Sequence, residues 1–254
     1  MTGSDIVAIV GAAAWAPQII QWINEARKKP KLELIPAPTV VLGYTPAGPV
    51  IQLAASISSQ NRDVIVTEMI VRVQHESREE RLLKWSSVAE TLASFNVPEI
   101  PGLSMNKTQN VLAVKAITET LTEKYLTFND SHFQRQAQEK INVAREHFNY
   151  LSGQVKEPAQ EIIRSKEFQQ AVQFLTDSVF WREGTYVLEV QVSGKQLKGV
   201  HREAFQVTLT RREIEGLQAN LQLIEEGLQE YVTSGQRIQK PWAFIHPSIR
   251  LASG

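Results

Sequence analysis

The side chains that could do chemistry are few in this sequence, and they are scattered. None of the five histidines has a second histidine at the HExxH spacing of a zinc hydrolase. His132 and His147 lie on one predicted helix, about 22 Å apart along its axis, which is too far to share a metal ion. The absence of cysteine excludes disulfides, thiolate metal sites and a cysteine nucleophile. We therefore predict no catalytic residue, no metal site and no cofactor.

Carboxylates and phosphate-binding loops give no stronger signal. Glu79-Glu80 and Glu225-Glu226 are adjacent pairs, and adjacent side chains diverge on strands and helices alike. Neither a glycine-rich phosphate loop nor a GxSxG motif is present. One alternative stays open, an enzyme whose active site is assembled from distant segments around His201, Arg202 and Glu203. Because active-site residues usually show some clustering, we favour a non-catalytic, membrane-associated binding or adaptor protein that acts through protein contacts.

The charge composition limits the classes of partner that the protein can be expected to bind. Lys plus Arg and Asp plus Glu are each 27, so the formal net charge is zero. Nucleic-acid binders normally carry a basic excess, and we therefore expect no nucleic-acid partner. The chain of 254 residues, 43% hydrophobic and 21% charged, is long enough for one or two folded domains. The identity of the protein partner is not encoded in any motif.

The most apolar stretch, residues 6–23, carries no charge and precedes a basic run. As a helix it spans about 27 Å, slightly short of the hydrocarbon core of a bilayer. The basic residues after it predict that the downstream end stays in the cytoplasm. Residues 1–28 are therefore predicted to be a single-pass membrane anchor with a cytoplasmic body. Its anchoring residues would be Trp15, Trp22, Arg27, Lys28 and Lys29.

Two other interpretations of this stretch remain open. Alanine-rich helices are common in protein cores, so residues 6–23 could pack against the body, or against a sister subunit, in a cytoplasmic soluble protein. A cleaved signal peptide is the third interpretation, although residues 2–5 lack its basic beginning.

Residues 29–234 are predicted to form the body, and their strands are indicated by a period of two. Apolar and polar residues alternate in 51–57, 65–73, 186–192 and 205–209, which predicts antiparallel pairs. A capping-box spacing from Ser87 to Glu90 predicts one short helix over residues 87–95. The inward-facing core is predicted to contain Ile51, Leu53, Met69, Val71, Tyr186, Leu188, Val190, Phe205, Val207 and Leu209.

Helical periodicity marks two further regions. Residues 131–151 and 158–178 have apolar residues at steps of three or four, which predicts a helical hairpin inserted at about 129–180. A last helix begins with a capping box, Thr210 and Glu213, and carries an apolar stripe. The stripe either packs within the chain or forms a homo-oligomer, and residues 235–254 form a tail. The predicted interaction surface consists of Leu221, Ile224, Leu228, Trp242 and Phe244.

The segment Trp181-Arg182-Glu183-Gly184-Thr185-Tyr186-Val187-Leu188-Glu189-Val190 resembles the approach to the penultimate strand of immunoglobulin-like and fibronectin-III-like sandwiches. In those domains the glycine makes the turn and the tyrosine forms a hydrogen-bonded corner. This sequence lacks the cysteine pair of those domains. The resemblance covers the strands rather than the helices. The resemblance implies an antiparallel immunoglobulin-like sandwich for the strands. Together with the helical patterns, the predicted fold class is mainly β with α additions: this sandwich with an inserted helical hairpin, a C-terminal amphipathic helix and an N-terminal hydrophobic helix. A fold of this kind does not specify a function.

Overall fold

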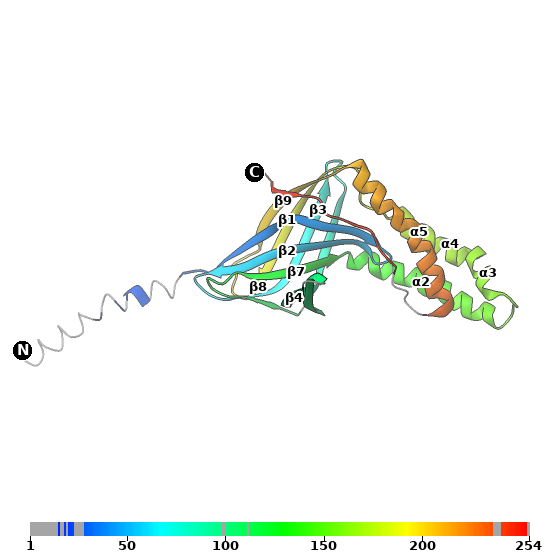
Figure 1. Ribbon diagram of the computed structural model, residues 1–254, viewed down its shortest axis with the longest axis horizontal. Helices are drawn as coiled ribbons and strands as arrows, with labels where there is room; N and C mark the ends of the chain where they lie inside the picture. Colours follow the sequence, from blue (N-terminus) through cyan, green and yellow to red (C-terminus); the bar gives the residue numbers. More distant parts are fainter. Residues whose placement is uncertain are drawn as a thin grey trace, which may run out of the picture.

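A rolled antiparallel sheet carries a group of helices at one of its ends (Figure 1). The computed structural model describes residues 15, 18, 20–22, 28–97, 100–110, 112–235 and 240–252. The strands follow the order β10-β1-β2-β7-β4-β3-β8-β9-β11, with β5 paired to β4 and β6 to β3. Their bounds are β1 Lys31–Thr45, β2 Gly48–Gln60, β3 Val64–His75, β4 Glu80–Val97, β5 Ile100–Asn110, β6 Val114–Ala116, β7 Thr122–Asn129, β8 Gly184–Gly194, β9 His201–Leu209, β10 Phe244–Ile245 and β11 Ile249–Leu251.

The two outer long strands, β1 and β9, are joined by the segment that was predicted as a tail. In β10, Ile245 pairs with Leu42 of β1, and a bridge joins Ser248 to Thr39. The chain then crosses to β9, where β11 pairs antiparallel over three residues. The C-terminal segment therefore fills the gap between the first and the last long strand of the sheet.

The predicted core is confirmed at every position. The strands place alternate side chains on the concave side of the sheet, because successive residues of a strand point to opposite faces. Leu188, Val190 and Phe205 are among the fully enclosed side chains. The other seven predicted core residues are buried as well: Ile51, Leu53, Met69, Val71, Tyr186, Val207 and Leu209.

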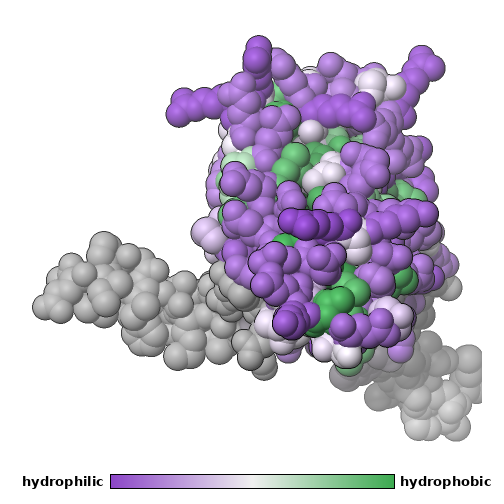
Figure 2. Space-filling model, turned by 90° about the vertical axis from the view of Figure 1, so that its right-hand side faces the viewer, coloured by the Kyte–Doolittle hydropathy of each residue, from purple (hydrophilic) through white to green (hydrophobic). Residues whose placement is uncertain are grey.

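The helices lie together beyond one end of the strands (Figures 1 and 2). Their bounds are α2 Ser131–Ser152, α3 Pro158–Arg164, α4 Lys166–Asp177 and α5 Arg211–Ser234. The second helix of the predicted hairpin is interrupted at Ser165, whose extended backbone ends α3 and whose hydroxyl caps α4. The predicted capping box of Thr210 and Glu213 is present at the start of α5. Seen from this end, the surface is mostly hydrophilic, with apolar side chains visible in a few patches (Figure 2).

The predicted helix over residues 87–95 is wrong, because β4 runs through it. Ser87 pairs with Asn110 of β5, and Phe95 pairs with Leu103. Residues 87–95 show no strict alternation of polarity, so the local sequence carried no clear strand signal against the capping-box spacing. The partner strand β5 lies later in the chain, and such pairing overrides weak local helix signals.

The predicted membrane anchor is contradicted. In the part of the chain that the structure describes, none of the helices is long and apolar enough to cross a membrane. Most of residues 1–28, including Arg27, lie outside the described residues. Trp15 and Trp22 are described, with 64% and 74% of their surface exposed, and Lys28 and Lys29 are exposed too.

Candidate functional site

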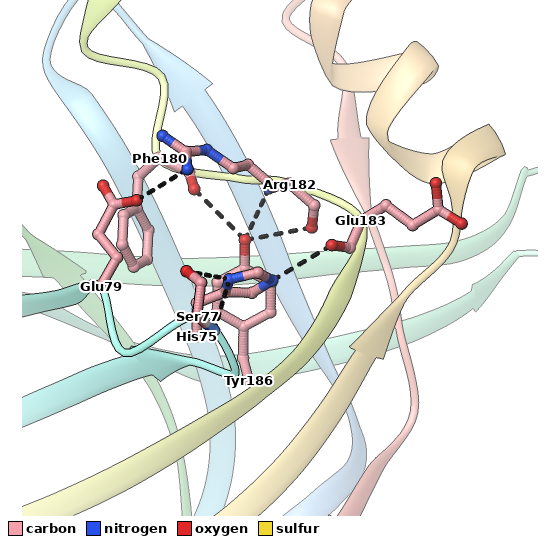
Figure 3. A network of polar contacts seen from close by, with 7 residues as sticks. All are labelled: His75, Ser77, Glu79, Phe180, Arg182, Glu183 and Tyr186. Carbon is pink, nitrogen blue, oxygen red and sulfur yellow. Dashed lines mark hydrogen bonds and ion pairs between the residues drawn. The ribbon is translucent and has the colours of Figure 1, made fainter.

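One polar network lies where the β3–β4 turn meets the start of β8, and it contains a Ser–His contact (Figure 3). The Nδ1 atom of His75 lies 2.8 Å from Ser77 Oγ and accepts from the Ser77 amide. The Nε2 atom lies 3.2 Å from the carbonyl oxygen of Glu183. Because a carbonyl oxygen only accepts, Nε2 carries the proton. Both ring nitrogens of His75 are thus committed to nearby groups.

Tyr186 forms the corner that the sequence resemblance implied. Its hydroxyl accepts from the Arg182 amide at 2.6 Å, and it lies 3.3 Å from the carbonyl oxygen of Phe180. Burial raises the pKa of the Tyr186 hydroxyl, which keeps it protonated as a donor. The His75 ring packs on the Tyr186 ring at 4.6 Å between centroids.

The network fastens the β3–β4 turn to the start of β8. Gly184 has a φ of +130°, and a Cβ there would lie 2.6 Å from His75 Nε2. An ion pair of 3.2 Å between Arg182 and Glu79 adds a second link between the same segments. No carboxylate orients the His75 ring, since its second nitrogen is held by a backbone carbonyl.

The alternative catalytic residues are only partly brought together. His201 Nε2 lies 2.9 Å from Glu203 Oε1, because residues two apart on β9 share a face. Arg202 lies on the opposite face, where its guanidinium is 3.8 Å from Glu189. Across the described residues, no group of three or more His, Cys, Asp and Glu residues is placed to hold a metal ion. The prediction that the chain has no catalytic or cofactor-binding residue stays a prediction.

The strongest candidate for a binding site is a groove of about 530 Å³ at the helical end. It lies between α2, α5, the β1–β2 turn and the C-terminal segment. None of its lining residues carries a charge. They are Thr45, Pro46, Ala47, Gln134, Ala137, Gln138, Ile141, Gly227, Leu228, Tyr231 and Trp242.

A buried asparagine on α5 fixes the walls of this groove. Asn220 is completely enclosed, and its amide donates to the carbonyls of Tyr44 and Ala243 at 2.9 and 2.8 Å. It also accepts from the Ala243 amide at 2.7 Å. These three hydrogen bonds join α5 to β1 and to the segment that carries Trp242. The relative positions of three walls therefore depend on one side chain.

Ion pairs hold the C-terminal segment beside α5. The Lys240 ammonium lies 2.8 Å from Glu230 and 3.6 Å from Glu226. The hydrogen bond that the Lys240 ammonium donates to Glu230 is the main reason why the pKa of Lys240 is raised. Next to this contact, a Cβ on Gly227 would meet the Trp242 ring at 3.9 Å, which is an ordinary van der Waals distance.

Two of the five predicted interaction residues, Leu228 and Trp242, line the groove. Ile224 is buried in the core, and Leu221 is partly buried against it. Phe244 covers Gly43 of β1, where an added Cβ would collide with the ring. The α5 stripe thus packs within its own chain, and the predicted homo-oligomer is untested. The predicted anchoring residues that the structure describes lie outside the groove lining. They are Trp15, Trp22, Lys28 and Lys29.

Sequence reasoning missed the polar half of the groove. Gln134 and Gln138 are four residues apart on α2, so they share one helix face. Nothing in their spacing distinguishes them from the other glutamines and glutamates of the same helix. A comparison with family models, with curated proteins and with solved structures finds no match to this chain. The function is therefore argued from the groove itself.

Proposed function

We propose that this chain is a non-catalytic binding protein, and that its groove holds an uncharged segment of a partner protein. The observation that carries the proposal is the groove of about 530 Å³ with no charged lining residue. Sites of this size are ordinary for ligand binding, and they combine apolar walls with a few polar groups that set orientation. Here Ile141, Leu228 and Trp242 supply apolar surface, and two glutamines supply amides.

A polypeptide segment suits this lining better than a charged metabolite does. Desolvating a charge in a groove without a counter-charge is costly. A glutamine amide has donors and an acceptor that match the C=O and N–H groups of a peptide backbone, although Gln138 already donates one hydrogen bond to Asn142 at 2.8 Å. Tyr231 and Trp242 are of the aromatic types enriched where protein partners bind most tightly. Tyr231 is further steadied by the Arg145 guanidinium, 5.4 Å from its ring centroid.

Photo-crosslinking in the expressing cells tests this proposal. A benzoylphenylalanine at Gln138, in the groove, should give a discrete protein adduct in the full-length chain. The matched control is Gln136, an exposed residue on the same helix outside the groove, where no adduct is expected. Gly227→Glu, which places a charge on the opposite wall, should abolish the adduct at position 138.

Two results would contradict the proposal. Equal adducts at positions 138 and 136 would mean that the groove is not where the partner binds. A mass increase at 138 that matches only a small organic compound would replace the protein partner by a small ligand.

The relation to immunoglobulin-like domains is likewise a proposal. It is supported by the Tyr186 corner, whose hydroxyl bonds to the backbone of residues 180 and 182. It is supported also by the antiparallel arrangement of the strands.

A further inference from the structure

Basic side chains gather at the end of the sheet opposite the helices, which we call the loop end. It comprises residues 28–31, the β2–β3 turn, the β6–β7 turn and the β8–β9 turn. In Figure 1 the chain enters the sheet at this end. Exposed cations are present in three of these segments and in the adjoining strand β6: Lys28, Lys29, Lys31, Arg62, Lys115 (in β6), Lys195 and Lys198.

Hydrogen bonds and strand register place these cations side by side. The Asn61 amide donates to the Lys29 carbonyl at 2.9 Å, which holds the entering chain against the β2–β3 turn. Ile65 pairs with Lys115 on one side, and its carbonyl accepts from the Lys195 amide on the other. The basic residues thus belong to one continuous face.

Acidic residues at the loop end are few. Asp63 is paired with Lys115 at 2.6 Å, so that cation is already neutralised. Glu119 is exposed on the β6–β7 turn. Because the whole chain has no net charge, a basic loop end means that acidic residues dominate elsewhere. The molecule is therefore electrically polarised along its strands.

Single apolar side chains project from the same turns. Leu121 is 61% exposed, Ile117 41% and Val200 45%. The first two lie beside the end of β2, because the Ser59 amide donates to the Ile117 carbonyl. Val200 belongs to a different turn, before β9. These side chains are separate tips rather than the contiguous apolar core that a protein interface requires.

We propose that the loop end docks on the surface of an anionic lipid bilayer, with its lysines at the headgroups and its apolar tips in the interface. Charge complementarity carries this assignment, since lysines near an anionic leaflet are attracted within a Debye length. Apolar side chains at the headgroup boundary add buried area. The chain before Lys28, which contains the uncharged residues 6–23, attaches at this same end. This contact does not depend on the groove, which lies at the other end of the strands.

Co-sedimentation of the full chain with vesicles tests the docking surface. Vesicles of phosphatidylcholine mixed with phosphatidylserine should pellet the protein, and vesicles of phosphatidylcholine alone should pellet much less. Each lysine near such a surface contributes about fivefold to the binding constant, so Lys195→Glu with Lys198→Glu should weaken binding at least about 25-fold. Raising the salt from roughly 0.05 M to 0.5 M should also release the protein.

The matched control reverses two charges at the other end. Lys156→Glu with Lys166→Glu changes the net charge by the same amount on exposed residues of the helical end, and vesicle binding should be retained. Circular dichroism of both double variants should match the parent chain. Equal binding to both vesicle types, or equal loss in both double variants, overturns the proposal. Binding to heparin through Lys195 and Lys198, without any vesicle binding, overturns it in favour of a soluble acidic partner.

Discussion

The two ends of the sheet differ in whether the hydrophobic core continues beyond the strands. At the helical end, Phe168 and Leu175 of α4 and Ile224 of α5 are completely buried, so the core of the sheet continues into the helices. At the loop end the core stops at the turns, and side chains such as Leu121 face outward. The turns of the loop end therefore lie outside the core, and their charges are free to vary. Exposed turns that add little to the fold can be shaped by what they contact.

The largest difference between the two ends should appear when one apolar side chain is truncated at each end. Phe168→Ala removes a fully buried ring and should lower the free energy of unfolding by about 3–5 kcal/mol. Leu121→Ala, at an exposed position, should change it by less than about 0.5 kcal/mol. Urea denaturation measures both. Equal effects would mean that the core extends into the loop end.

A second prediction concerns the side chain that fixes the groove walls. Asn220→Ala leaves the buried polar groups of Tyr44 and Ala243 without their partner, and each lost bond costs about 1 kcal/mol or more. The free energy of unfolding should fall by about 2–3 kcal/mol. Hydrogen exchange should quicken most at residues 240–252. The control is Asn142→Ala on the exposed face of α2, for which little change is expected. An unaltered exchange pattern in the C-terminal segment would refute the role given to Asn220.

The smallest effect is expected from pH at the loop end. Hydrogen bonds from Lys115 and Thr118 lower the pKa of Asp63 to about 2. A lowered pKa in the folded state favours folding above the pKa of the unfolded chain, and this contribution is lost as the pH falls from about 4 towards 2. An NMR titration of the Asp63 carboxyl should show its midpoint near 2, well below the ordinary value of about 4 for an aspartate. A midpoint near 4 would mean that Asp63 is solvated rather than paired.

How far the sequence predicts the structure depends on how local each signal is. The strands around Leu188 and Val207 were predicted because each carries its own alternation. The extension of β4 past Ser87 was not, because its partner β5 begins beyond the next turn. Leu228 and Trp242 were singled out by their apolarity alone. Gln138 could not be singled out, because a glutamine that faces a groove and a glutamine that faces water occur in the same sequence pattern.

The fold cannot be completed until the C-terminal segment has been synthesised. Leu42 leaves the ribosome early, but its partner Ile245 is synthesised about 200 residues later, which takes roughly 10 to 40 s. During that interval β1 has no neighbour on this side, and an unpaired strand edge invites association with other nascent chains. Pro36 and Pro38, which lack an amide hydrogen, lie in β1 beside the stretch left open. They would discourage such premature pairing until the late-made strand arrives.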